Sequence, residues 1–119
     1  MSKMRSSIFP VRGEVWIVTF DPTVGHEQGG VRPALIVSGD AFNHSPAELV
    51  MVAPITTTDR RVPGHVRVIP PEGGLARTSY IMTDQLRTAS NRRLGRRLGT
   101  ISAATLTEVE SHLRLHLDL

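Results

Sequence analysis

A glycine-rich segment ahead of an apolar run places one arginine where it could handle a phosphate. Gly29 and Gly30 come three and two residues before Arg32, and Pro33 then opens the apolar run. Glycine lets the backbone approach a ligand closely, and proline biases the preceding residue towards an extended backbone. An arginine held in this way can grip a phosphate through its planar guanidinium. The other interpretation is an ion pair with a carboxylate at the strand edge, which these residues alone slightly favour.

The five histidines are the next candidates, because histidine moves protons near neutral pH. His26 lies in a long loop and His65 begins a strand, so either could touch a substrate. For both, and for His44, an exposed loop side chain is the preferred interpretation. His112 and His116 are four residues apart on a helix, a spacing that can bind zinc, but no third ligand lies nearby. We therefore predict no metal site and interpret this pair as a solvated helix face or a dimer contact.

Arginine dominates the basic residues, since Lys3 is the single lysine among 14 Lys and Arg residues. This bias favours a polyanionic partner such as nucleic acid, although a GC-rich genome would produce the same bias. We interpret one group as an electrostatic track for RNA or an acidic partner, and the other as ordinary charged surface. The first group is Arg60, Arg61 and Arg67, and the second is Arg92, Arg93, Arg96 and Arg97.

Length and composition exclude several classes of protein. The 119 residues predict one domain, which we divide into a flexible N-terminal leader at 1–11 and a folded domain at 12–119. The absence of cysteine excludes a disulfide framework and a thiolate metal site. No apolar run approaches the roughly 20 residues of a membrane-spanning helix. The first ten residues lack the apolar region of a signal peptide, so we expect a cytoplasmic protein without membrane contact.

Several short strands and one helix must position these residues. Apolar and alternating patterns predict strands, separated by turns rich in glycine and proline, with room for a short helical piece at Gly39–Pro46. The predicted strands are Gly13–Phe20, Pro33–Ser38, Leu49–Ile55, His65–Ile69 and Thr78–Leu86, followed by a sixth that ends near Ile101 after a turn at Asn91–Gly99 containing the repeat Arg-Arg-Leu-Gly. Ser102 is a plausible N-cap for a helix whose apolar stripe is Leu106, Val109, Leu113 and Leu117. The pattern predicts a small barrel or bent antiparallel sheet with the helix packed on it.

Three segments resemble, in order, the signatures of the MazF/PemK toxins, over nearly the whole chain from about Arg12 to Leu117. They are Gly13-Glu14-Val15-Trp16 with Glu27-Gln28-Gly29-Gly30-Val31-Arg32-Pro33-Ala34-Leu35-Ile36-Val37-Ser38, then Ala53-Pro54-Ile55-Thr56-Thr57, and Ser79-Tyr80-Ile81-Met82-Thr83-Asp84-Gln85-Leu86-Arg87-Thr88. The resemblance implies a single-domain, SH3-like barrel of the CcdB/PemK type with a terminal helix. It also implies a homodimer that cuts single-stranded mRNA and is inhibited by an acidic, partly disordered MazE-like antitoxin.

The same resemblance implies that Arg32 and Thr56 are the catalytic residues, with no metal and no cofactor. The residues that we expect to bind RNA or support the site are Gln28, Gly29, Gly30, Thr57, Arg60, Arg61, Ser79, Gln85 and Arg87. RNA carries its own nucleophile, the 2′-hydroxyl, so catalysis needs positioning and charge stabilisation. Arginine is almost always protonated, so Arg32 would stabilise the phosphorane or donate a proton to the 5′-oxygen rather than act as a base. Thr56 would orient a phosphate oxygen.

Two alternatives keep the same fold. One is a non-enzymatic toxin of the CcdB type, which poisons DNA gyrase by binding; it depends on a Trp-Gly-Ile-like C-terminus, whereas this chain ends Leu117-Asp118-Leu119. The other is an RNA-binding barrel without catalysis. Trp16 could stack on a base, but its position in a strand favours packing in the core or a dimer contact.

Overall fold

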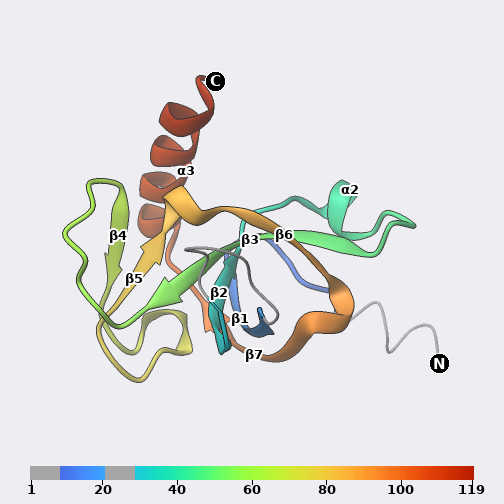
Figure 1. The fold of residues 1–119 in the computed structure, drawn as a ribbon, viewed down its shortest axis with the longest axis horizontal. Coiled ribbons are helices and arrows are strands. Elements are labelled where there is room, and N and C mark those ends of the chain that lie inside the picture. Colours follow the sequence, from blue (N-terminus) through green and yellow to red (C-terminus); the bar gives the residue numbers. More distant parts are fainter. Residues whose placement is uncertain (1–8, 21–28) are drawn as a thin grey trace.

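The computed structural model describes residues 9–20 and 29–119, which form an antiparallel sheet with a helix packed at one side (Figure 1). The strands are β1 (Glu14–Thr19), β2 (Val31–Ile36), β3 (Leu49–Thr56), β4 (His65–Val68), β5 (Ser79–Met82), β6 (Arg87–Ser90) and β7 (Leu94–Thr100). The helices are α2 (Asp40–Asn43) and α3 (Ala103–Leu117), with 3-10 turns η1 (Glu72–Gly74), η2 (Thr83–Gln85) and η3 (Asn91–Arg93). The predicted fold class, mainly β with a C-terminal helix, is confirmed. Within the described residues, no helix is long and apolar enough to cross a membrane.

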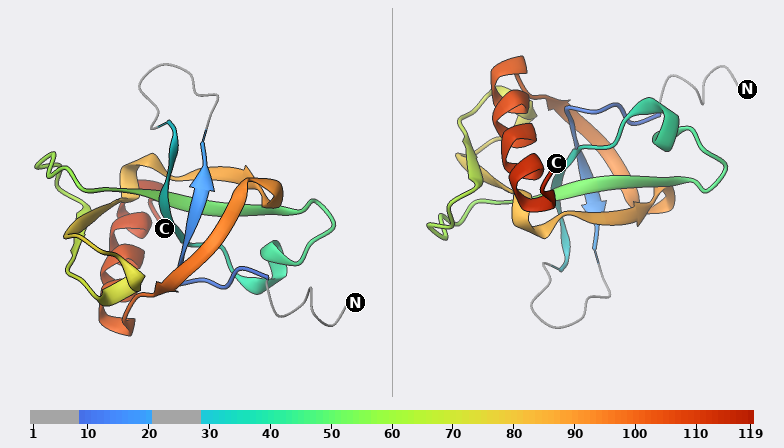
Figure 2. Two further views of the ribbon diagram at one scale, coloured as in Figure 1. Left: turned by 90° about the horizontal axis from the view of Figure 1, so that it is seen from below. Right: turned by 90° about the horizontal axis from the view of Figure 1, so that it is seen from above.

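The order of the strands shows that the sheet must curl. It runs β4-β5-β3-β2-β1-β7, and β6 pairs with the part of β3 that β5 leaves free. β6 and β7 therefore flank β3-β2-β1 on opposite sides, yet only the three residues of η3 join them. So short a connection is possible only if the sheet bends until its two sides approach each other, as the views in Figure 2 show.

The predicted strand Thr78–Leu86 was wrong as a single element, because η2 divides it into β5 and the start of β6. Continuing the β3–β5 register would place position 84 opposite Val52, but the observed partner of Val52 is Arg87. The three residues of η2 are therefore looped out of the ladder. Long-range contacts hold this loop, since Thr83 Oγ1 donates to the carbonyl of Gly64 at 2.6 Å. A local apolar pattern carries no sign of such a contact.

The predicted turn at Asn91–Gly99 was also wrong over most of its length. Only residues 91–93 turn, and the Arg-Arg-Leu-Gly repeat continues as β7, which pairs with β1 through irregular register shifts. Taken by itself, this segment of glycines and repeated arginines favours a turn. Pairing with β1 supplies backbone hydrogen bonds that the local pattern does not reveal.

Buried side chains form two cores, one on each face of the sheet. The helix core consists of Val15, Leu35, Val37, Ala53, Ile55, Val66, Val68, Leu75, Ile81, Ile101 and Val109. The barrel core consists of Trp16, Val18, Phe20, Ala34, Ile36, Val50, Val52 and Ala89. Because successive side chains of a strand point to opposite faces, β1, β2 and β3 contribute alternate residues to the two cores.

The helix α3 begins and packs as its sequence predicts. Ser102 Oγ accepts a hydrogen bond from the backbone N–H of Thr105, which confirms the predicted N-cap. Val109 is fully buried, and Leu106 and Leu113 pack against the helix core. Leu117 departs from the predicted stripe, since it is 54% exposed near the end of the helix.

Candidate functional site

Arg32 lies near the beginning of β2 and is held by two backbone carbonyls. Its Nε donates to the carbonyl oxygen of Gly29 at 3.0 Å, and one terminal nitrogen lies 3.5 Å from the carbonyl oxygen of Ile55 on β3. No carboxylate is paired with Arg32 among the described residues. Within the described residues the ion-pair interpretation therefore has no carboxylate partner, and the guanidinium keeps donors for an anionic ligand.

The turn before β2 explains the two glycines. Gly30 has φ of +76°, a left-handed conformation that residues with a side chain rarely adopt. Its carbonyl accepts from the N–H of Phe20, which joins the end of β1 to the beginning of β2. The turn also aims the Gly29 carbonyl at Arg32, so these glycines position the arginine.

The charge on Arg32 is in a less favourable environment than in water. Partial burial, and secondarily the positive charge of Arg60, lower the pKa of Arg32 below its usual value. Two guanidinium groups that repel each other will both gain from an anion placed between them. A lowered pKa also makes Arg32 a better proton donor than an exposed arginine.

Thr56 ends β3 beside Arg32. Ala34 pairs with Pro54, so extending this antiparallel register by two residues sets Arg32 opposite Thr56. Thr56 is 6% exposed, and its Oγ1 accepts from the N–H of Thr58 at 3.1 Å. Because the oxygen already accepts a bond, the hydroxyl proton can be donated to a ligand. The structure thus brings together the two residues predicted to be catalytic.

The row that contains Arg32 and Thr56 continues across the sheet in both directions. Thr56 pairs with Tyr80 on β5, and Tyr80 pairs with Arg67 on β4. On the other side, Arg32 pairs with Val18 of the barrel core. Directly opposed residues share a face of the sheet. We call Arg67, Tyr80, Thr56 and Arg32 the site row; it continues the barrel-core face beyond that core.

Arg87 lies on the same face and reaches the barrel core near the glycine turn. Its guanidinium carbon is 5.0 Å from the centroid of the Phe20 ring, and the backbone N–H of Phe20 donates to the carbonyl of Gly30. One terminal nitrogen of Arg87 is buried without a hydrogen-bond partner among the described residues. A buried cationic donor of this kind is costly unless a ligand satisfies it.

The other predicted site residues are distributed unevenly. Thr57, Arg60 and Arg61 are exposed directly after β3, and Arg60 is close enough to influence Arg32. Gln85 is half-buried in η2. Gln28, like His26, lies outside the described residues.

Ser79 does not share the face of Arg32 and Thr56. It is buried, pairs with Val68 of the helix core, and donates through Oγ to the carbonyl of Arg77 at 2.7 Å. Its neighbour Tyr80, which no site prediction included, occupies the site row instead. Strand alternation around Ser79 is the signal that could have identified Tyr80, once the pairing with Thr56 was known.

Several other predictions concern residues outside the site row. The exposed-loop interpretation was wrong for His65, whose side chain is 4% exposed and binds Asp84 at 2.7 Å. His44 is exposed, and its ring lies against Phe9. His116 Nε2 lies 3.0 Å from Thr83 Oγ1, so this histidine links α3 to η2.

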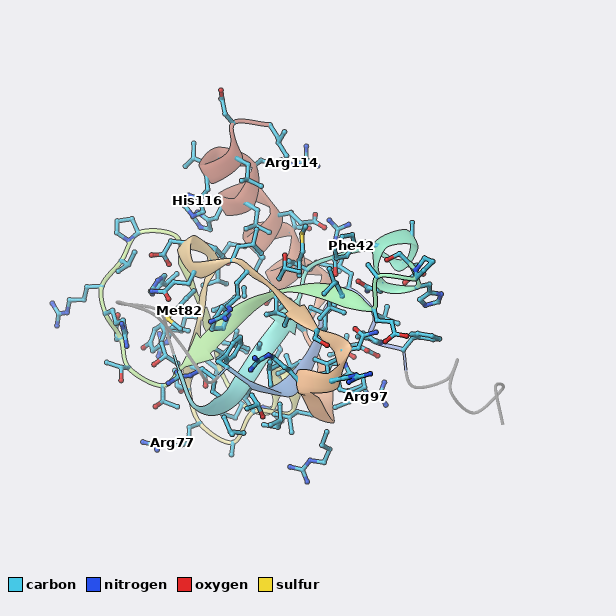
Figure 3. All side chains as sticks on the ribbon, turned by 45° about the vertical axis from the view of Figure 1, so that its right-hand side comes forward. Phe42, Arg77, Met82, Arg97, Arg114 and His116 are labelled. Carbon is cyan, nitrogen blue, oxygen red and sulfur yellow. The ribbon has the colours of Figure 1, made fainter. Side chains whose placement is uncertain are left out.

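Trp16 packs in the barrel core, and its indole N–H donates to Glu14 at 3.0 Å, which excludes it as an open stacking surface. Arg97, on β7 (Figure 3), pairs with the same carboxylate group at 3.0 Å. In the described part of the chain, no three His, Cys, Asp or Glu residues gather as metal ligands would.

Comparison with known proteins identifies one group of relatives. The family described as "PemK-like, MazF-like toxin of type II toxin-antitoxin system" matches residues 11–117. Endoribonuclease MazF9 from Mycobacterium tuberculosis is 36% identical over 113 residues, which is 91% of this chain and 96% of that protein. The crystal structure of MazF from Deinococcus radiodurans matches with a TM-score of 0.83 at 30% identity, covering 93% of this chain and 98% of that one. A mycobacterial endoribonuclease in complex with its cognate antitoxin matches with a TM-score of 0.74 at 33% identity, covering 92% and 96%.

Proposed function

Since the chain belongs to the PemK-like, MazF-like toxins of type II toxin-antitoxin systems, we propose that it is a sequence-specific endoribonuclease that cuts single-stranded RNA without a metal ion. The relatives named endoribonuclease support the activity. The observation that supports the site is the contact between the Arg32 guanidinium and the carbonyl of Ile55, the residue before Thr56, together with the register of β2 and β3, which brings Arg32 opposite Thr56 when it is extended by two residues. This arrangement favours catalysis over the two alternatives, gyrase binding and RNA binding alone.

The proposed reaction uses the 2′-hydroxyl of the RNA as the nucleophile. The O2′–P bond forms as the proton of the 2′-hydroxyl passes to water, and the P–O5′ bond breaks, which leaves a 2′,3′-cyclic phosphate and a free 5′-hydroxyl. Arg32 stabilises the negative charge that develops on the phosphoryl oxygens and donates a proton towards the departing 5′-oxygen. Any proton that Arg32 gives to the 5′-oxygen is regained from water. The Thr56 hydroxyl donates to a phosphoryl oxygen and so fixes the geometry of attack.

The remaining predicted residues bind and position the substrate. Arg87 offers to a phosphate or a base carbonyl the terminal nitrogen that has no partner among the described residues. Arg60, which already repels Arg32, adds a second positive charge near the scissile phosphate. Gly29 and Gly30 hold Arg32 in place, and Thr57, Arg61, Gln85 and Gln28 are assigned to the surrounding RNA contacts.

We assign three partners to this toxin. Its RNA substrate is messenger RNA, which it would meet in the cytoplasm. A second copy of the chain would cover apolar surface that the monomer exposes, since Leu115, Leu117 and Leu119 are 76%, 54% and 85% exposed. The third partner is an antitoxin, as in the relative solved in complex with its cognate antitoxin; an acidic segment of it would complement the charge of the arginines in the site.

The test is cleavage of a long single-stranded RNA followed by mapping of the cut positions. We expect cuts at one short sequence motif, products with a free 5′-hydroxyl, and no cleavage when the nucleotide before the cut carries a 2′-deoxy sugar. A chelator should leave the rate unchanged, because the described residues offer no ligand cluster. Intact RNA after incubation, together with inhibition of purified gyrase, would overturn the proposal in favour of the non-enzymatic alternative.

A further inference from the structure

We propose that Tyr80 and Arg67 form an RNA subsite that extends the catalytic pair across β5 and β4. The ring of Tyr80 stacks on the base of a nucleotide close to the scissile phosphate, and Arg67 binds a backbone phosphate further along the same strand of RNA. This inference rests on the proposed function, because it assigns a substrate path to the same site.

The pairing of the strands places the two residues beside the catalytic pair. Tyr80 is directly opposite Thr56 on one side and directly opposite Arg67 on the other. Directly opposed residues of antiparallel strands have Cβ atoms about 4.5–5.5 Å apart on the same face. Neighbouring strands are about 4.8 Å apart, so Arg67 lies about 10 Å across the sheet from Thr56, a distance that a few nucleotides span.

Among the aromatic residues, Tyr80 is the one that the structure makes available in this row. Trp16 and Phe20 are buried in the barrel core. Phe9 packs against His44, and Phe42 lies in α2, which follows the opposite end of β2 from Arg32. Tyr80 is half-buried. A ring fixed by its strand, with one part open, is a surface on which any base can stack.

Arg67 adds a charge at the far end of the row. It is exposed and makes no ion pair with a described carboxylate, in contrast to Arg97, which pairs with Glu14. The site row thus alternates a cation, a ring, a hydroxyl and a second cation. Backbone-tracking cations with an aromatic platform between them are the combination that binds single-stranded nucleic acid.

The experiment measures binding apart from cleavage. Single-stranded RNA oligonucleotides that carry a 2′-deoxy sugar throughout the mapped cut motif serve as uncut probes in fluorescence anisotropy titrations; if no cut is found, the unmodified RNA is itself the probe. The proteins are the wild type, Tyr80→Phe, the two ring-less variants Tyr80→Thr and Tyr80→Val, Arg67→Gln, and Arg96→Gln as a control. Arg96 is an exposed arginine of β7, at the other edge of the sheet order, so it matches Arg67 in charge. Thr and Val suit a half-buried strand position, so at least one ring-less variant should fold.

We expect Tyr80→Phe to bind like the wild type, because the ring is retained. Loss of the ring should weaken binding by roughly 5- to 150-fold, which corresponds to about 1–3 kcal/mol. Arg67→Gln should lower the slope of log affinity against log salt by about 0.7 in magnitude. Arg96→Gln should change neither quantity.

Probes with one abasic nucleotide identify the stacked base. One abasic position should weaken binding to the wild type and have no effect on the ring-less variants, because both changes remove the same contact. Additive losses at every position, or ring-less variants that bind like the wild type, would overturn the subsite. If the wild type binds RNA through Tyr80 but never cuts it, the subsite stands and the proposed nuclease activity fails.

Discussion

The two faces of one sheet are closed in different ways, and the difference explains where the chemistry lies. The helix core is covered by a separate element, α3, whose Val109 is fully buried against the strands. The barrel core is enclosed by the curl of the sheet itself, and in the described part of the chain no helix residue belongs to it (Figure 2). The face under α3 is filled by apolar contacts. At the edge of the curled face, the strands present polar side chains, among them Arg32 and Thr56; we call this edge the rim.

The rim also differs from the helix core in its charge. Arg32 and Thr56 continue the strands that carry Ala34 and Val52 of the barrel core. Their backbones are fixed by the ladder, so the side chains are preorganised without being fully buried. The comparison predicts that changes at the rim affect activity, whereas changes under α3 affect stability.

The largest expected effect is on catalysis at the rim. Arg32→Ala should reduce the rate of RNA cleavage by about 10²- to 10³-fold or more, because it removes the charge that stabilises the transition state. The melting temperature should change little, since Arg32 is only partly buried and bonds two backbone carbonyls rather than a buried charge. Single-turnover cleavage of a short RNA measures the rate, and circular dichroism measures the melting.

The Arg32→Lys variant separates the effect of charge from that of geometry, because lysine keeps the charge but lacks the planar guanidinium. A large loss in Arg32→Lys would show that geometry matters beside charge. Full activity in Arg32→Ala would remove the rim from the mechanism, and Arg96→Ala provides the control for loss of a positive charge elsewhere.

The second effect is on stability under the helix. Val109→Ala should lower the free energy of unfolding by about 1–3 kcal/mol, because it removes two buried methyl groups and leaves a cavity. Urea titration measures this change, and RNA cleavage well below the melting temperature should keep its rate. Thr107→Ala is the matched control on the same helix, because Thr107 is β-branched like Val109 but exposed, so its loss should cost little. Equal costs for both variants would contradict the packing of α3 on the sheet.

The smallest effect concerns the pH dependence of stability at the beginning of α3. Burial would raise the pKa of Glu72, but hydrogen bonds from the Thr105 side chain and from Ser102 outweigh it and lower that pKa. A carboxyl group with a lowered pKa stabilises the fold above its unfolded value of about 4.3, and the contribution is lost as the pH falls through the folded value. The melting temperature of the wild type should therefore exceed that of Glu72→Gln at about pH 5, and this difference should disappear as the pH falls to about 3.

Melting temperatures of both proteins across that range provide the measurement. If the melting temperatures of the two proteins changed in parallel with pH, the charge of Glu72 would not stabilise the beginning of α3. Cleavage at neutral pH should be the same in both proteins, because Glu72 lies at the helix side of the molecule.

Local patterns predicted most elements, and long-range contacts explain the exceptions. The helix was predictable because its cap and apolar stripe are local signals, as Ser102 and Val109 confirm. The break between β5 and β6 was not, because Thr83 turns out of the ladder to bond Gly64. Burial of His65 against Asp84 was missed for the same reason, since the two residues are distant in the chain.

By itself, the sequence determined the family, the class of fold and the two residues proposed for catalysis, because motifs and the alternation of apolar side chains are properties of neighbouring residues. Only the tertiary structure decided which side chains share a face. It set Arg32 opposite Thr56, added Tyr80 and Arg67 to their row, and turned Ser79 to the other side. The physical reason is the register between strands, which depends on the curl of the whole sheet, and a shift of one residue would exchange the faces.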